Sequence, residues 1–389
     1  MSILPRIADF ADELTAIRHD LHAHPELGFE ETRTAGIVAA QLRACGVDEV
    51  HEGIGGTGVV GLIHGKGRGN RRIGLRADMD ALPIEEASGV PYASKNPGRM
   101  HACGHDGHTT MLLGAARYLA ETRDFDGTVI VVFQPAEEGL GGARAMLADG
   151  LFERFPCDEI YGLHNDPTAG PGRAAVTPGP AMAGAHFFDI TVRGTGSHAA
   201  MPHQSRDPIV IASALVGQIQ TIVSRNAPPI KALVVSVTKL QAGSAYNVVP
   251  ATATLAGTIR YFDDAVSGMA TERLRTLCAG LATAYGVEIE VDIRNIFDVL
   301  MNDPDLSAEY AAAAAEIVDE GNVTLGGDPV TGSEDFADML KSVPGAYIRV
   351  GHAGSVPLHN PAFVLDDGIL PVGASIMARL VERRLPFGR

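Results

Sequence analysis

The chain has 389 residues, more than twice the length of a typical domain of roughly 150 residues, so two domains are expected. Because 46% of its residues are hydrophobic and 20% are charged, it can bury a large core, which excludes a disordered or fibrous protein. Its formal net charge of −16 argues against a surface that binds the phosphate backbone of nucleic acid.

The cysteines and the hydropathy pattern predict a cytoplasmic protein. Four cysteines in a chain of this length are too few and too scattered for a disulfide framework, so reduced thiols are expected. The N-terminus has no basic segment followed by an apolar run, as a signal peptide would have. The longest apolar stretches fall well short of the ~20 residues that a membrane span needs, so no membrane partner is expected.

Helices and strands alternate over the first 180 residues. Helical periodicity occurs at 7–22, 35–45, 108–122 and 142–149, and extended apolar runs occur at 57–63, 72–76, 128–133 and 159–163. Strands alternating with helices are typical of a largely parallel sheet covered on both faces. The pattern predicts an α/β fold.

The order of elements changes after residue 183. Strand, helix, strand, strand, helix and strand are predicted at 186–192, 207–225, 232–240, 252–261, 265–285 and 288–294. This βαββαβ order is that of the ferredoxin-like unit. The α/β pattern then returns, with helices at 306–320, from Ser333 onward and at 367–384, and a strand at 346–350. We therefore predict a catalytic α/β domain over residues 1–182 and 296–389, with a lid or dimerisation domain inserted at 183–295.

The segment HACGHDGH, residues 101–108, is the densest group of chemically active side chains. It holds three histidines, one cysteine and one aspartate. Thiolate and imidazole are preferred ligands of zinc and also bind other divalent ions. Two ligands one residue apart in an extended loop could reach one ion or two adjacent ions. The alternative is a solvated histidine-rich turn. His108 is expected to open the next helix and to play a supporting role only.

A second group, QPAEEG at residues 134–139, follows an apolar strand that ends at Phe133. This is where open α/β sheets bind ligands. Adjacent carboxylates on extended backbone point in different directions, so one can ligate a metal while the other acts as a general base. A Glu-Glu pair by itself is more typical of a solvated surface, and only its combination with the first group favours a site.

Four further polar residues are candidates for the same site. His164 ends an apolar strand and could be a ligand or a core histidine, and His359 lies in a proline-flanked loop with the same two alternatives. Asp78 and Asp80 follow a strand and lie on one side of it. They could orient ligand imidazoles from behind, or simply cap the turn at the strand end.

Together these motifs resemble a known family. The order RADMDALP, HACGHDGH, QPAEEG, His164, GSHAAMPH, GSEDF and LHNPAF resembles that of the dinuclear metal amidohydrolases, over essentially the whole chain. These enzymes include hippurate hydrolase, bacterial N-acyl-amino-acid aminoacylases and plant auxin-conjugate hydrolases. The resemblance implies hydrolysis of the amide bond of N-acyl amino acids by metal-activated water, with Glu137 as general base. It implies two divalent ions, held by Cys103, His105, Glu138, His164 and His359.

The sequence also departs from more distant members of that family. Cys103 stands where distant metallopeptidase relatives carry a bridging aspartate, and Asp78 stands where they carry a metal-binding histidine. How the ligands divide between the ions is therefore left open. Zinc or manganese is expected, and cobalt or nickel is compatible with the same ligands.

The inserted domain contributes three more candidates. GTGSHAAMP resembles a lid segment whose histidine reaches the active site of a partner protomer, which implies that His198 stabilises the oxyanion and that the protein is a homodimer or higher oligomer. Asn247 and Arg260 match positions that bind the substrate carboxylate, for which the planar guanidinium is suited. The alternatives are a turn histidine and a strand-end salt bridge. Glu334 and Asp335 are expected to cap a helix.

Two other functions remain open on the sequence. A metallodipeptidase would use the same metals but would require a free amino group on its substrate. A non-catalytic protein could use the cleft to bind a metal or an acyl amino acid. In each case the ligand is a small molecule.

Overall fold

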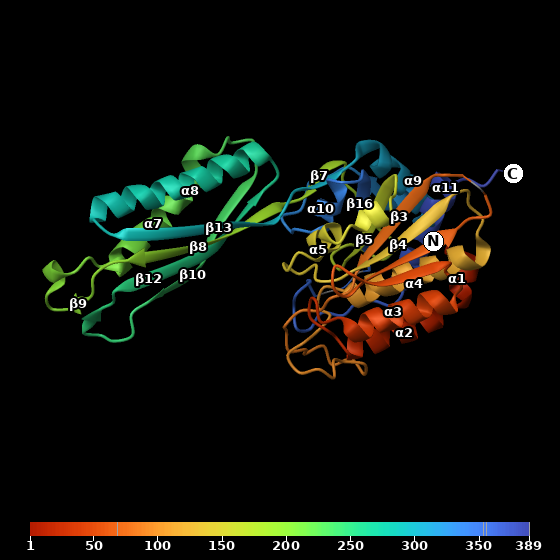
Figure 1. Ribbon diagram of the computed structural model, residues 1–389, viewed down its shortest axis with the longest axis horizontal. Coiled ribbons are helices and arrows are strands. Elements are labelled where there is room, and N and C mark those ends of the chain that lie inside the picture. The colour runs from red at the N-terminus through yellow and green to blue at the C-terminus, as the bar shows by residue number, and fades with distance from the viewer. Residues whose placement is uncertain (68, 353, 355, 389) are drawn as a thin grey trace. The chain divides into compact units, whose positions relative to one another are not determined.

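The computed structural model describes residues 1–67, 69–352, 354 and 356–388, which form two compact units (Figure 1). Unit 1 comprises Met1–Ala181, Leu300–Pro329 and the chain from Asp335 onward. Unit 2 comprises Met182–Val299 and Val330–Glu334. Each unit has its own sheet and its own hydrophobic core.

An eight-stranded sheet forms the centre of unit 1, in the order β1-β2-β4-β3-β5-β16-β6-β15. Neighbours β4, β3, β5 and β16 are parallel, whereas β1 and β2 are antiparallel additions at one edge. This mixed, mostly parallel sheet confirms the predicted α/β class. The strands are β1 Glu49–Ile54, β2 Gly58–His64, β3 Arg72–Asp78, β4 Thr128–Gln134, β5 Glu159–Asp166, β6 Ala174–Val176, β15 Val323–Leu325 and β16 Gly345–Gly351.

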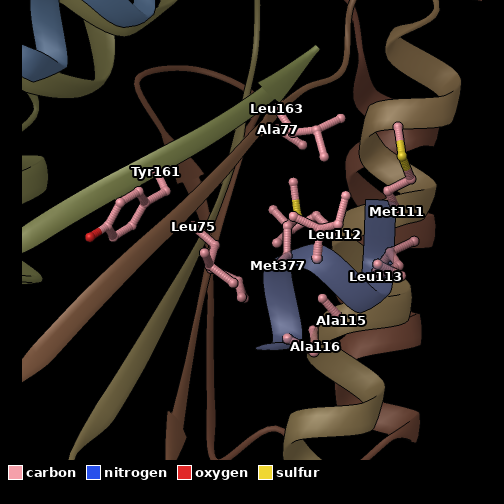
Figure 2. Packing of buried hydrophobic residues seen from close by; sticks show 14 of the residues in the cluster. Leu75, Ala77, Met111, Leu112, Leu113, Ala115, Ala116, Tyr161, Leu163 and Met377 are labelled. Carbon is pink, nitrogen blue, oxygen red and sulfur yellow. The ribbon is translucent and has the colours of Figure 1, made fainter. Parts of the chain in front are cut away.

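Helices pack against this sheet and bury its apolar side chains. Side chains alternate along a strand, so Leu75 and Ala77 of β3 point to the same face, where they meet Met111 of α4 and Met377 of α11 (Figure 2). The helices of unit 1 are α1 Pro5–Asp9, α2 Ala11–Ala23, α3 Thr32–Ala44, α4 His105–Thr122, α5 Gly142–Ala148, α6 Leu151–Arg154, α9 Pro304–Val318, α10 Phe336–Leu340 and α11 Ile369–Arg384. A short pair, β7 Gly179–Met182 and β14 Leu300–Asn302, completes the strands.

Unit 2 has the predicted βαββαβ order. Its sheet runs β10-β12-β8-β13 with every neighbouring pair antiparallel, and α7 and α8 pack on it (Figure 1). The elements are β8 Gly184–Arg193, β9 Ser197–His198, α7 Pro208–Thr221, a π-helical turn Ile222–Asn226, β10 Leu233–Ala242, β11 Val248–Val249, β12 Thr252–Tyr261, α8 Asp264–Tyr285 and β13 Glu288–Phe297. Asp207 and Asp263 cap α7 and α8 through their side chains.

One helical segment in the described part of the chain, Pro208–Asn226, is long and apolar enough to span a membrane by length and composition alone. Its buried apolar residues, among them Ile211, Leu215 and Ile219, belong to the core of unit 2. The high hydropathy is therefore explained in part by packing within the unit.

Several predicted boundaries were wrong for identifiable reasons. The helix expected at 7–22 is two helices, because Phe10 leaves helical geometry and is buried between them. Helix α4 begins at His105 rather than His108, because Gly104 takes a left-handed φ of 93° and reverses the chain just before it. The helix expected from Ser333 begins at Phe336. Strands β1, β6, β7, β14 and β15 were not predicted, because they are short or largely exposed and carry no strong apolar alternation.

The parallel strands end at one edge of the sheet, where polar residues gather. Asp78 ends β3, Gln134 ends β4, and β5 ends with the run from His164 to Asp166. Because these three strands are adjacent and parallel, the polar motifs that follow them meet at this edge.

Candidate metal centre

Five ligand candidates meet in two groups that share one sulfur. In the first group, the Sγ of Cys103, a ring nitrogen of His105 and a ring nitrogen of His164 all lie within 4.8 Å of one another. In the second group, the Sγ of Cys103 lies within the same distance of a carboxylate oxygen of Glu138 and a ring nitrogen of His359. All five residues belong to unit 1.

Gly104 makes the approach of Cys103 and His105 in this cluster sterically feasible. Its φ of 93° lies in the left-handed region, and a Cβ there would lie 2.4 Å from Nδ2 of Asn165. The turn at Gly104 separates Cys103 from His105, the first residue of α4. The ligand spacing of the motif is thus produced by a glycine turn, not by an extended loop.

Hydrogen bonds fix the orientation of two imidazoles. Nδ1 of His105 donates to Oδ1 of Asp80 at 3.1 Å, and Nδ1 of His164 donates to the carbonyl of Asn165 at 2.6 Å. Both rings therefore present Nε2 to the cluster, and Nε2 of His164 lies 3.5 Å from Sγ of Cys103. A carboxylate or carbonyl behind an imidazole is the usual support of a metal-bound histidine.

Two buried atoms of the cluster lack a hydrogen bond of regular geometry among the described residues. They are Nε2 of His105 and Oε1 of Glu138, which lie 3.9 Å from each other. Oε1 of Glu138 also lies 3.3 Å from Nε2 of His359. Buried polar atoms without a hydrogen bond of regular geometry are rare in native proteins, and a divalent cation would satisfy both. The residues present therefore fit the dinuclear site that the sequence suggests.

The electrostatics also favour a cation. Burial lowers the pKa of His105, but Asp78 and Cys103 outweigh it and hold that pKa well above its usual value. Cys103 and Glu138, which lie beside the ring, raise the pKa of His359 to about 10. Burial, with His108 nearby, lowers the pKa of His164 well below its usual value, which leaves its ring neutral. The site attracts positive charge, and a divalent ion competes with protons for it.

The two adjacent glutamates follow β4 as predicted, and both face the cluster. His105, Glu137 and Glu138 each place a ligand atom within 4.8 Å of the other two. Oδ2 of Asp80 accepts a hydrogen bond from the backbone N–H of Glu138 at 3.0 Å. Asp80 thereby holds both His105 and the turn that carries the glutamates. Oε1 of Glu137 accepts from the N–H of Asp335 at 3.4 Å.

Asp78 supports a histidine outside the two ligand groups that share Cys103. Its Oδ1 accepts from Nδ1 of His108 at 2.7 Å, and its Oδ2 accepts from Arg76 at 2.8 Å. Nε2 of His108 accepts the N–H of Asn165 at 2.9 Å. Both ring nitrogens of His108 are thus engaged within the protein.

Two further residues of the site, Asn165 and Arg76, were not predicted from the sequence. Nδ2 of Asn165 donates to the carbonyl of Cys103 at 2.6 Å, and its Oδ1 bonds Nε2 of His352 at 3.1 Å. Arg76, fully buried, joins Asp78 to Gln134 and Asp335. The available signal was a charged or amide residue next to an apolar strand run, since such residues are buried only when they are paired.

The three candidates from the inserted domain all lie in unit 2. His198 is exposed on β9 and pairs with Val248 of β11, and the carbonyl of Asn247 accepts the N–H of Ala199 at 3.0 Å. Arg260, on β12, donates to the hydroxyl of Ser333. Burial lowers the pKa of Arg260.

The comparison with protein families agrees with this chemistry. The model of peptidase family M20/M25/M40 matches residues 74–383. The chain belongs to this family. Among its M20 relatives, hippurate hydrolase of Campylobacter jejuni is 41% identical over 99% of this chain and 100% of its own length. The N-acetylcysteine deacetylase of Bacillus subtilis is 37% identical over 95% of this chain and 96% of its own.

A solved M20 structure has the same fold. The YXEP protein of Bacillus subtilis, described as a dinuclear metal binding peptidase, superposes with a TM-score of 0.83 and 34% identity, covering 98% of this chain and 100% of that one. These findings confirm the predicted family and show that this M20 protein is a metal-dependent amidohydrolase. The family and the ligand groups together support two divalent ions as its cofactor.

Proposed function

We propose that this M20 enzyme hydrolyses small N-acyl amino acids to a carboxylic acid and a free amino acid. The observation that carries the proposal is the pair of ligand groups around Cys103 with Glu137 and Glu138 beside them. Its relatives include proteins named hippurate hydrolase, N-acetylcysteine deacetylase, N-acetyldiaminopimelate deacetylase and IAA-amino acid hydrolase. In each of these names the substrate is an amide of an amino acid.

We assign one ion to Cys103, His105 and His164, and the other to Cys103, Glu138 and His359. Thiolate and imidazole favour zinc, and the carboxylate also suits manganese, while cobalt and nickel fit the same set. When bound, such ions polarise a substrate carbonyl and lower the pKa of a coordinated water.

The protein's own side chains complete the proposed reaction. Glu137 is the general base: its carboxylate accepts the proton of the attacking water and passes it to the leaving amine. His198 stabilises the oxyanion by donating a hydrogen bond. Asn247 and Arg260 bind the substrate carboxylate, which the guanidinium can grip with two parallel hydrogen bonds. Asp80 keeps His105 and Glu138 in place, and Asp78 does so for His108.

Peptide hydrolysis is the second candidate. Thermostable carboxypeptidase 2 of Saccharolobus solfataricus is 36% identical over 96% of this chain and 96% of its own length. The same metals and base would serve, because a peptide also presents an amide next to a carboxylate. A non-catalytic binding protein is less well supported, because the base and all five ligand candidates are present together.

We propose that the enzyme is a homodimer joined through unit 2. Among the described residues, β10 is an edge strand with β12 as its one neighbour in the sheet, and its Val234 and Leu240 are exposed. The opposite edge, β13, carries the charged residues Glu288, Glu290, Asp292 and Arg294, which discourage pairing. Exposed Ile209 and Val210 of α7 extend the apolar surface of the unit. A second copy pairing at β10 would flank Val234 on one face of the sheet and Leu240 on the other, and His198 would then act across the dimer.

We also place the enzyme in the cytoplasm. All four cysteines are free thiols, which agrees with a reducing compartment.

The test is amino-acid release from hippurate, N-acetyl amino acids, indole-acetyl conjugates and free dipeptides, using metal-stripped protein with and without added zinc or manganese. Release from N-acylated compounds that depends on added metal is the expected result. Release from dipeptides alone would favour the peptidase, and no release from any compound would favour a binding protein.

A further inference from the structure

The turn that presents Glu137 contains a strained residue. Ala136 is fully buried and has a φ of 53°, in the left-handed region that residues with a Cβ mostly avoid. It directly precedes Glu137, so its backbone torsions set the direction in which that side chain leaves the chain. Residues in such conformations persist only when surrounding contacts hold them there.

Both backbone polar groups of Ala136 are held. Its carbonyl accepts the N–H of Gly142 at 3.0 Å, closing the turn locally. Its N–H donates to Oε1 of Glu31 at 2.8 Å, and Glu31 lies 105 positions earlier in the chain. The first contact is local to the turn, whereas the second, like the bond from the N–H of Glu138 to Asp80, ties the turn to a distant segment of unit 1.

Glu31 is built to serve as a fixed acceptor. It is fully buried, and the hydroxyl of Thr57 donates to its other carboxylate oxygen. The segment just before it is also attached to a residue next to Asp80, because the N–H of Ala81 donates to the carbonyl of Glu26 at 2.8 Å. One segment, Glu26–Glu31, thus contacts the residue after Asp80 and the residue before Glu137.

We propose that Glu31 is a positioning residue for catalysis: its buried carboxylate holds Ala136 in the left-handed conformation and thereby aims the carboxylate of Glu137 at the reacting water. This inference rests on the proposed role of Glu137 as general base. Glu31 itself touches neither substrate nor metal in this scheme, and it acts only through the backbone of the turn.

The test compares Glu31→Ala, Ala136→Gly and the double variant in steady-state hydrolysis of the best N-acyl substrate at saturating metal. Glu31→Ala is expected to lower kcat by on the order of 10- to 100-fold with little change in KM, because misplacing a catalytic group by about 1 Å has such an effect. Glycine adopts a left-handed φ without steric strain. Adding Ala136→Gly should therefore restore kcat by at least about 5-fold.

Two further variants separate positioning from a loss of stability. Glu31→Gln keeps the side-chain volume and an oxygen that accepts from Ala136, so it should retain most of the wild-type kcat even if Glu31→Ala does not fold. Glu159→Ala removes another buried carboxylate, which is bonded to Arg384 at the opposite end of β5. It should lower the melting temperature and leave kcat unchanged.

Metal content is measured for every variant and should equal that of the wild type. The inference is overturned if Glu31→Ala keeps the wild-type kcat, or if Ala136→Gly fails to restore any of the lost kcat. Failure of the proposed function is distinguishable, because then Glu137→Gln would retain turnover whatever Glu31 does.

Discussion

Single residues carry the chemistry of the site, and Cys103 is the one that both ligand groups share. Cys103→Ala should therefore lower the affinity for both ions. The loss should exceed the roughly 10- to 100-fold loss of affinity that follows removal of a residue that only supports a ligand. His359→Ala removes a ligand of one group and should leave one ion per chain. The measurement is metal content after dialysis, with titration of the stripped protein.

Cys157→Ala is the matched control for that experiment. Cys157 is a half-buried free thiol outside both ligand groups, so its loss should leave two ions bound. If Cys103→Ala retained one tightly bound ion, a shared thiolate would be ruled out.

A buried network of charged groups near the start of α4 leads to a prediction about how stability depends on pH. Nδ1 of His22 lies 2.9 Å from Oδ2 of Asp106, and Nε2 lies 3.2 Å from Glu86. Burial lowers the pKa of His22, but Asp106 and Glu86 outweigh it and raise the pKa to about 9. A raised folded-state pKa contributes stability that is complete below the unfolded pKa of about 6.5 and is lost as the pH rises through 9.

The difference in unfolding free energy between the wild type and His22→Gln should therefore shrink between pH 6.5 and 9, by at most about 3 kcal/mol. Urea unfolding of both proteins across that range measures it. A difference that stayed constant or grew with pH would show that the imidazole is neutral in the folded protein.

Among the elements, the contact of α4 with α11 depends on a glycine. A Cβ added at Gly373 of α11 would lie 2.0 Å from the sulfur of Met111 in α4, so alanine there should destabilise the protein by about 1–3 kcal/mol. Gly36 of α3 is exposed and has no atom within 4 Å of an added Cβ. Gly36→Ala should instead stabilise by up to about 1 kcal/mol through helix propensity. Chemical denaturation of both variants measures the change in unfolding free energy, which should be negative for the first and positive for the second. Equal changes would contradict the packing argument.

At the scale of the whole molecule, the proposed dimer is tested at the edge of unit 2. Light scattering should show a dimer for the wild type and a monomer for the double variant Val234→Lys, Leu240→Lys, because a charged edge strand resists pairing. Glu288→Lys with Glu290→Lys changes the other edge and should leave the dimer intact. A monomeric, fully active wild type would remove both the dimer and the action of His198 in trans.

The sequence was sufficient for the fold class and for the residue types of the site. Periodicity separated the α/β part from the βαββαβ part, because apolar spacing reflects which face of each element is buried. It placed element ends less well: Phe10 separates two helices and Gly104 directly precedes a third, through backbone torsions that composition does not reveal. The motifs around Cys103 and Glu137 were visible because thiol, imidazole and carboxylate groups are rarely so dense without a ligand.

Contacts between distant segments were decided by the tertiary structure alone. That Cys103 belongs to two ligand groups, that Asp78 supports His108, and that Glu31 reaches Ala136 all depend on which strands become neighbours. A local pattern encodes periodicity and chemical type, because these act within a few residues. The direction of a ring nitrogen or the torsion of Ala136 is set by packing between segments far apart in the chain, and so only the folded protein determines it.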